Sequence, residues 1–219
     1  MTRTRVLIAD DHEILLDAFK RLLEPDYDVV GAVTDGQALI QSAESLNPQV
    51  IIADISMPRL NGLDAAERLL ARVPDVKLVF LTVNEDPEVA AEAIRRGASG
   101  YVLKKSASAE LFEALRLVLH GGTYVTPAIA KISTVDFVAG AKRAGPVRGL
   151  SLRQREVLQL LAEGKSMKEA ADILGVATRT IAFHKYSMIE HLRLKNGAEL
   201  VQYAVTHHLV SPRVYGHSQ

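Results

Sequence analysis

Five short apolar segments alternate with five amphipathic segments over the first 120 residues, and this alternation constrains the fold more than any other feature. The apolar segments are rich in Val, Ile and Leu and too short for helices, which indicates strands. The segments between them repeat apolar residues at helical spacing and end at Gly or Pro, which indicates helices. Regular alternation predicts an α/β fold, a five-stranded doubly wound parallel sheet covered by helices on both faces. The expected strands are 5–9, 28–32, 50–53, 77–82 and 100–103, and the expected helices are 12–23, 36–46, 63–71, 87–96 and 108–120.

Polar side chains stand at the ends of four of these strands. Asp10 and Asp11 follow the first strand, Asp54 follows the third, Thr82 ends the fourth and Lys104 follows the fifth. The carboxyl ends of parallel strands meet at one edge of the sheet, where open α/β sheets bind ligands. Three carboxylates placed together repel one another, so a divalent cation is expected, and oxygen ligands suit Mg²⁺. The hydroxyl and the ammonium then suit a phosphoryl group carried by one carboxylate.

Each of these residues also has a simple structural explanation. Asp54 could cap the turn after its strand, and Asp10 with Asp11 could cap the first helix. Thr82 could cap the fourth helix, and Lys104 could be a solvated strand end. Four independent structural roles at four strand ends are less economical than one shared site, so we adopt the site.

The same half of the chain resembles the receiver domain of two-component response regulators over residues 5–121. The motifs that carry the resemblance lie at the same strand ends and in the turn after the third strand. They are Asp10-Asp11, Asp54-Ile55-Ser56-Met57-Pro58, Asn61-Gly62, Thr82 and Gly100-Tyr101-Val102-Leu103-Lys104.

This resemblance implies a phosphoacceptor and a metal site. Asp54 would be the phosphoacceptor and would also face the metal ion. Asp11 would bind Mg²⁺ directly and Asp10 through water, and the backbone carbonyl of Ser56 would complete the site.

The resemblance also implies a switch. The Thr82 hydroxyl would move to the phosphoryl group and the Tyr101 ring would follow it inward, while Lys104 would pair with the phosphoryl group. Two residues depart from the usual pattern: Val83 stands where the family has a smaller residue, and Lys105 stands where many receivers have proline.

Charge and composition divide the chain, although its net charge is zero. Residues 1–120 hold 13 Lys/Arg and 19 Asp/Glu, whereas residues 121–149 and 150–219 each carry a net charge of +3. The basic second half indicates a polyanionic partner. We expect a short helix over 128–137 and a flexible basic linker over 139–149. The expected domains are a receiver at 1–121, a linker at 122–147, a helix-turn-helix domain at 148–212 and a tail at 213–219.

The second half is expected to be a small all-α domain. Ser151 with Gln154 and Ser166 with Glu169 have the spacing of capping boxes, so helices should begin at each serine. Further helices are expected over 178–192 and 197–208. Two short helices joined by a glycine-containing turn are typical of a helix-turn-helix, and a generic four-helix bundle is the alternative.

The helix expected over 178–192 carries an outward row of residues at helical spacing. Arg can contact guanine in the major groove and apolar groups can contact thymine methyls, while lysines elsewhere can reach phosphates. Residues 148–212 resemble the LuxR/NarL-type helix-turn-helix, through Leu150 to Leu158, Ala170 to Leu174 and Thr180 to His184. The expected DNA contacts are Arg179, Ala182, Phe183, Lys185, Tyr186, Lys165, Lys168 and Lys195.

The sequence therefore predicts a NarL/FixJ-type response regulator, a transcription factor controlled by phosphorylation of Asp54. The expected partners are a sensor histidine kinase, double-stranded DNA and a second copy of the chain, with RNA polymerase as a further candidate. The only expected chemistry is self-phosphorylation and dephosphorylation of Asp54, so it is not predicted to be a conventional enzyme. No cysteine, membrane-length apolar run or signal peptide is present, which favours a cytoplasmic protein.

Two alternatives stay open. One is a folded receiver that is not phosphorylated and responds to a ligand or partner instead. The other is a metal-dependent phosphatase with an Asp nucleophile, which would need a substrate pocket or cap for which the short βα units leave no insertion.

Overall fold

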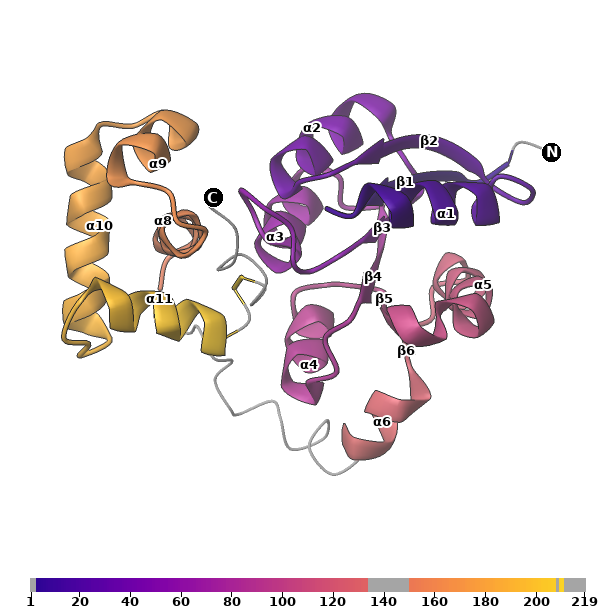
Figure 1. Ribbon diagram of the computed structural model, residues 1–219. Helices are drawn as coiled ribbons and strands as arrows, with labels where there is room; N and C mark the ends of the chain where they lie inside the picture. The colour runs from indigo at the N-terminus through magenta and orange to yellow at the C-terminus, as the bar shows by residue number, and fades with distance from the viewer. Residues whose placement is uncertain (1–2, 134–149, 208, 211–219) are drawn as a thin grey trace. The chain divides into compact units, whose positions relative to one another are not determined.

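The computed structural model describes residues 3–133, 150–207 and 209–210, which fall into two compact units (Figure 1). The first unit is a parallel sheet with helices on both faces, and the second is entirely helical. None of the helices in these ranges is long and apolar enough to cross a membrane. The predicted elements that lie wholly within these ranges are all present, with ends that differ from expectation by at most two residues. The helix expected over 128–137 is described from Pro127 to Ser133, and its last expected residues lie outside the described ranges.

The sheet of the first unit is parallel throughout, in the order β2-β1-β3-β4-β5-β6. Strand β1 pairs with both β2 and β3. From β1 the chain therefore adds β2 on one side and the later strands on the other side. This order places the ends of β1 and β3 side by side, next to those of β4 and β5. The strands are β1 (Arg5–Ala9), β2 (Asp28–Val33), β3 (Val50–Ala53), β4 (Lys77–Thr82), β5 (Gly100–Leu103) and β6 (Tyr124–Val125).

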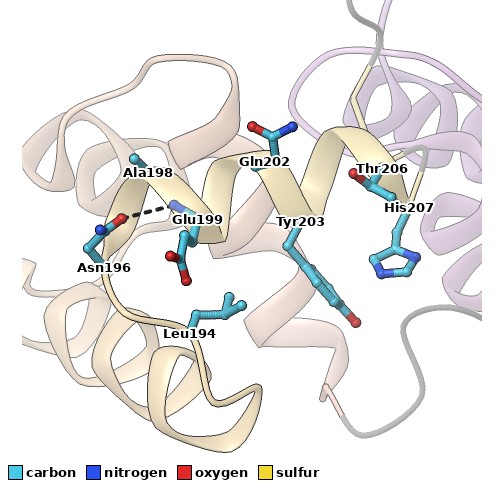
Figure 2. A pocket seen from close by; sticks show the side chains of 8 residues that line it. All are labelled: Leu194, Asn196, Ala198, Glu199, Gln202, Tyr203, Thr206 and His207. Atoms are coloured by element: carbon cyan, nitrogen blue, oxygen red, sulfur yellow. Dashed lines mark hydrogen bonds between the residues drawn. The ribbon is translucent and has the colours of Figure 1, made fainter.

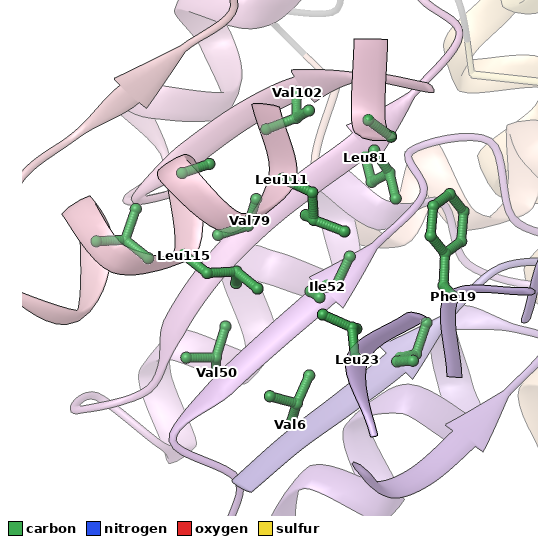
Figure 3. Packing of buried hydrophobic residues seen from close by; sticks show 14 of the residues in the cluster. Val6, Phe19, Leu23, Val50, Ile52, Val79, Leu81, Val102, Leu111 and Leu115 are labelled. Carbon is green, nitrogen blue, oxygen red and sulfur yellow. The ribbon is translucent and has the colours of Figure 1, made fainter. Parts of the chain in front are cut away.

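Helices cover both faces of this sheet. Alternate residues of the central strands point to one face, where Val6, Ile52 and Leu81 pack against Phe19 and Leu111 of the covering helices (Figure 3). The central strands β3 and β5 are buried at every residue, as their continuous apolar sequences predict. The helices on this face are α1 (Glu13–Leu23) and α5 (Ala107–Leu119). The unit also contains α2 (Gly36–Leu46), α3 (Gly62–Arg72) and α4 (Pro87–Arg95).

A sixth strand extends the predicted five-stranded sheet. The expected linker begins at residue 122, but Tyr124–Val125 form β6 and pair with Gly100 and Tyr101 of β5. Helix α6 (Pro127–Ser133) follows and packs against α4. A two-residue strand has too little periodicity to be recognised from sequence, which is why the pattern suggested a linker there. The rest of that linker, 134–147, and the expected tail lie outside the described residues.

The second unit contains α8 (Leu152–Ala162), α9 (Met167–Leu174), α10 (Thr178–His191) and α11 (Gly197–Thr206). Both predicted capping boxes are present: the Ser151 and Ser166 side chains accept from the N–H groups of Gln154 and Glu169, whose side chains accept in return. Gly175, in the left-handed region at φ 63°, ends α9 and turns the chain toward α10.

The last helix, α11, is capped by Asn196, whose side chain accepts from the N–H of Glu199 at 3.0 Å (Figure 2). Its inner face buries Leu200 and Ala204 in the core of the unit. A shallow pocket lies along its outer side and includes Tyr203 and His207, whose rings are 4.1 Å apart. The helix therefore closes the bundle and leaves a second face uncovered within the unit.

Candidate functional site

Asp54 leaves the sheet directly after β3, at the edge where the four polar strand ends were expected to meet. Its backbone N–H still donates to the Ala9 carbonyl at 2.8 Å, so the β1–β3 pairing places the residue beside Asp10. Asp10 and Asp54 are each only 2% exposed, and Thr82 is fully buried. The Asp54 carboxylate also accepts from the N–H of Ile55 at 2.6 Å. The structure therefore brings the predicted carboxylates together in a protected position.

Lys104 completes this cluster from the end of β5. Its ammonium lies 2.7 Å from Asp54 Oδ2 and 2.6 Å from Asp10 Oδ2. Burial alone would lower the pKa of Lys104, but the two carboxylates more than compensate and raise it above its ordinary value. The side chain therefore stays charged and bridges two acids that would otherwise repel each other.

Asp11 lies at the solvent side of the cluster, where a histidine joins it. His12 Nδ1 is 2.8 Å from Asp11 Oδ1 and 3.1 Å from Asp10 Oδ1. Burial is the largest influence and raises the pKa of the Asp11 carboxyl. His12, the next largest, acts in the opposite direction, while Asp54 and Asp10 add smaller upward contributions. The sequence-based site omits His12, although its position directly after Asp10-Asp11 is a signal that could have found it.

The loop after Asp54 folds back against the site and requires a glycine. The N–H of Gly62 donates to the Ile55 carbonyl at 2.8 Å. A Cβ atom at Gly62 would lie 2.2 Å from the backbone oxygen of Asp54, closer than any real contact. The expected Asn61-Gly62 turn thus brings the start of α3 against the backbone of the phosphoacceptor candidate. Ser56 is half-buried in this loop, and the role of its carbonyl as a metal ligand stays a prediction.

The proposed switch residues lie on β4 and β5 and meet through Asn84. The Thr82 hydroxyl accepts from the N–H of Asn84 at 3.2 Å, and the Tyr101 hydroxyl donates to the Asn84 carbonyl at 2.9 Å. The Tyr101 ring is fully buried, and this burial, with the nearby Asp86 and Asp54, raises the pKa of its hydroxyl far above its ordinary value. The phenol therefore remains a neutral donor that ties β5 to the loop before α4.

The two departures from the receiver pattern lie at the solvent side of the β4 and β5 ends. Val83 is 69% exposed, so its larger side chain does not enter the core. Lys105 points away from the carboxylates and forms a 2.7 Å ion pair with Glu85 of the β4–α4 loop. Adjacent lysines thus have separate roles, one buried between acids and one exposed.

The donor set fits a magnesium ion. Oxygen atoms of Asp10, Asp11 and Asp54 lie within 4.8 Å of one another, together with a ring nitrogen of His12. Three carboxylates, of which Asp11 lies at the solvent side, match the oxygen coordination that Mg²⁺ prefers. The excess of negative charge over the single ammonium of Lys104 also favours a divalent cation.

The candidate DNA-contact surface lies on α10 of the helical unit. Ile181 and Met188 face the core, whereas Phe183 and Tyr186 are 69% and 62% exposed and Arg179 is also exposed. Exposed aromatic residues next to an arginine are unusual on a helix whose outer face only meets water. The structure therefore places the predicted contact row on the outside of this helix.

The remaining predicted contacts surround this row. Ala182 and Lys185 are half-buried on α10, and the Lys185 ammonium lies 5.8 Å from the centre of the Tyr186 ring. The lysines predicted to reach phosphates are all exposed, one in the first turn of α9 and the others in the turns before α9 and after α10. They are Lys165, Lys168 and Lys195.

The first unit is a doubly wound sheet with acids, a lysine and a Thr/Tyr pair at its carboxyl edge, and the same chain carries a helix-turn-helix unit. This combination defines a receiver-type regulator. Comparison with known families agrees: residues 6–116 match the response regulator receiver domain, and residues 148–204 match the bacterial regulatory proteins of the luxR family. The chain belongs to the NarL/FixJ family of two-component response regulators, whose members are DNA-binding transcriptional regulators.

Individual relatives extend over nearly the whole chain. The oxygen regulatory protein NreC of Staphylococcus carnosus is 35% identical over 92% of this chain and 96% of its own length. The transcriptional regulatory protein DegU of Brevibacillus brevis is 30% identical over 91% and 92%. Among solved structures, RcsB of Salmonella typhimurium is 29% identical, covering 94% of this chain and 98% of its own, with a TM-score of 0.65. RcsB of Salmonella enterica serovar Typhimurium bound to the P1flhDC promoter with the phosphomimetic BeF₃⁻ is 30% identical, covering 94% and 100%, with a TM-score of 0.62.

Proposed function

We propose that Asp54 accepts a phosphoryl group from a partner sensor histidine kinase and that this modification controls DNA binding. The observation that carries the proposal is the buried Asp54 carboxylate, 2.7 Å from the Lys104 ammonium and beside Asp10. A carboxylate oxygen would form the bond to phosphorus while the bond to the donor's imidazole nitrogen breaks. The only reactions assigned to the chain are this transfer and the later hydrolysis of the acyl phosphate.

Asp11, Asp10 through water, Asp54 and the Ser56 carbonyl would hold Mg²⁺. When bound, the ion would supply positive charge against the carboxylates and the transferred group. Lys104 would then pair with a phosphoryl oxygen, because its ammonium already lies against Asp54. Thr82 would turn its hydroxyl toward the same group, and the already buried Tyr101, bonded to the Asn84 carbonyl, would carry this change to the loop containing Asn84.

The released or rearranged helical unit would bind double-stranded DNA as a dimer in the cytoplasm, with RNA polymerase as a candidate partner. One solved relative, RcsB, is described as two dimers bound to two parallel DNAs. In this chain, Arg179, Phe183 and Tyr186 would enter the major groove and the exposed lysines would contact phosphates. The mixed apolar and basic row predicts contacts with thymine methyls as well as guanine.

Incubation with Mg²⁺ and acetyl phosphate tests the phosphorylation step. The wild-type chain should gain one base-labile phosphoryl group, measured by intact mass, and Asp54→Ala should gain none. Retention of the label on Asp54→Ala would falsify the assignment. Turnover of added phosphate esters would support a phosphatase instead.

Binding to genomic fragments tests the DNA surface. Arg179→Ala combined with Tyr186→Ala should weaken specific binding by about 2 to 6 kcal/mol, because each base contact contributes about 1 to 3 kcal/mol. Lys20→Ala is the control, since it removes an exposed positive charge from α1 of the other unit. An equal loss of DNA affinity in both variants would contradict the assignment of α10 as the helix that contacts DNA.

A further inference from the structure

The segment directly after α5 is held by a buried polar contact that the phosphorylation site does not use. The Thr126 hydroxyl donates to Glu110 Oε2 at 2.8 Å and accepts from the backbone N–H of Leu103 at 3.1 Å. The Tyr124 hydroxyl donates to the same glutamate oxygen at 3.1 Å. Thr126 is 1% exposed, so these bonds are made away from water, where an unmade bond is most costly.

Backbone pairing joins the same segment to β5. The N–H of Thr126 donates to the Tyr101 carbonyl at 2.9 Å, and the N–H of Tyr124 donates to the Ser99 carbonyl at 3.0 Å. Thr126 is therefore bonded to two positions of β5, one that carries the switch tyrosine and one that directly precedes Lys104. Any shift of this strand end must move Thr126 or break its bonds.

Helix α6, at the end of this segment, contacts α4, the helix that follows the loop containing Asn84. Helix α6 starts after Thr126 and packs against α4, with Ile129 only 2% exposed. Helix α4 begins at Pro87, directly after the loop whose Asn84 carbonyl accepts from Tyr101. Residues 124–133 thus contact both elements that flank the switch, the strand β5 and the helix α4.

We propose that Glu110 and Thr126 form a latch that makes residues 124–133 part of the receiver and passes the state of Asp54 to the chain leading into the DNA-binding unit. The inference rests on the proposed function, because it needs a phosphoryl-dependent movement near Tyr101. Glu110 and Thr126 are positioning residues: neither touches Asp54, and both act through β5. Residues 124–133 then belong to the receiver, although the sequence places the start of the linker at residue 122.

Hydrogen exchange of the full-length protein tests the latch itself. Glu110→Ala and Thr126→Val should each raise exchange across 122–130 by about tenfold, because each removes buried hydrogen bonds. Two further variants serve as controls: Thr126→Ser keeps the hydroxyl, and Glu113→Ala removes an exposed carboxylate from α5, the helix that carries Glu110. Both controls should stay within about twofold of wild type. Equal exchange in Glu110→Ala and Glu113→Ala would overturn the latch.

The same measurement with Mg²⁺ and BeF₃⁻ tests the coupling. In the wild-type chain, BeF₃⁻ should change exchange both in the loop 83–87 and in 122–130, and in Glu110→Ala only the loop should respond. A wild-type loop response without any change in 122–130 would overturn the proposed coupling. If neither segment responds, the proposed phosphoryl switch fails and the coupling with it, whereas the comparison of Glu110→Ala with Glu113→Ala still decides whether the latch exists.

Discussion

The Lys104 ammonium lies 2.7 Å from Asp54 Oδ2 and 2.6 Å from Asp10 Oδ2, so one positive charge bridges two buried acids. Lys104 therefore has a role before any phosphoryl group is bound. It neutralises the same carboxylates that a divalent cation would bind. Cation binding and the lysine contact are thus expected to compete for Asp10 and Asp54.

Replacing Lys104 by Met should increase the affinity for Mg²⁺ by about tenfold or more, because two closely placed carboxylates lose their compensating charge. Isothermal titration of the purified chain with Mg²⁺ measures this directly. Lys105→Met is a matched control, since Lys105 pairs with the exposed Glu85 and not with the acids. Unchanged or weaker Mg²⁺ binding in Lys104→Met would show that the lysine does not compete for these carboxylates.

Gly62→Ala should destabilise the receiver by about 3 kcal/mol or more, because the new methyl group would overlap the backbone oxygen of Asp54. Urea unfolding measures the loss. Gly31→Ala should cost less, since a Cβ there would meet the ends of the flexible side chains of Leu46 and Leu7. Similar costs at both positions would mean that the loop after Asp54 can move away from the site.

The raised pKa of the Tyr124 hydroxyl predicts that the free energy of unfolding decreases at alkaline pH. Burial first, and Glu110 second, raise this pKa to about 12. The unfolded value is about 10, so this stabilisation is complete below pH 10 and is lost as the pH rises from 10 toward 12. The stability of wild type relative to Tyr124→Phe should therefore decrease over that interval, as measured by thermal unfolding. A constant difference between the two proteins from pH 8 to 12 would contradict the raised pKa of the Tyr124 hydroxyl.

Helix α10 begins without a side-chain cap, because Ala177 occupies the N-cap position. Its extended backbone, with φ −73° and ψ 146°, suits a serine. Ala177→Ser should stabilise the first turn of α10 by about 1 kcal/mol, and Ser166→Ala should destabilise α9 by a similar amount. Hydrogen exchange in each first turn measures both effects. If exchange in α10 is unchanged by the serine, its first N–H groups are already satisfied by another route.

The sequence allowed most of the receiver site to be predicted because strand ends converge by topology. Asp10, Asp54 and Lys104 are far apart in the chain, yet parallel pairing brings their strand ends to one edge, whatever the details of packing. The capping boxes at Ser151 and Ser166 were equally predictable, since they depend only on residues three positions apart.

Contacts that depend on side-chain direction or on short pairing were not predictable. His12 directly follows Asp10-Asp11, which places it near the site, but the sequence does not show that its ring contacts both carboxylates. Strand β6 contains two residues, too few for an alternating pattern, and its partner lies more than 20 residues away. Glu110 appears in the sequence as an ordinary helix-surface residue, and only the docking of Thr126 gives it a buried contact.

The most direct test of phosphorylation control is the affinity of the full-length chain for an operator found by genome-wide footprinting, measured with Mg²⁺ in the presence and absence of BeF₃⁻. The account predicts that BeF₃⁻ strengthens wild-type binding by about tenfold, a coupling of about 1.4 kcal/mol, and leaves Asp54→Ala unchanged. Equal affinity of the wild-type chain in both conditions, or an equal gain in Asp54→Ala, would contradict it.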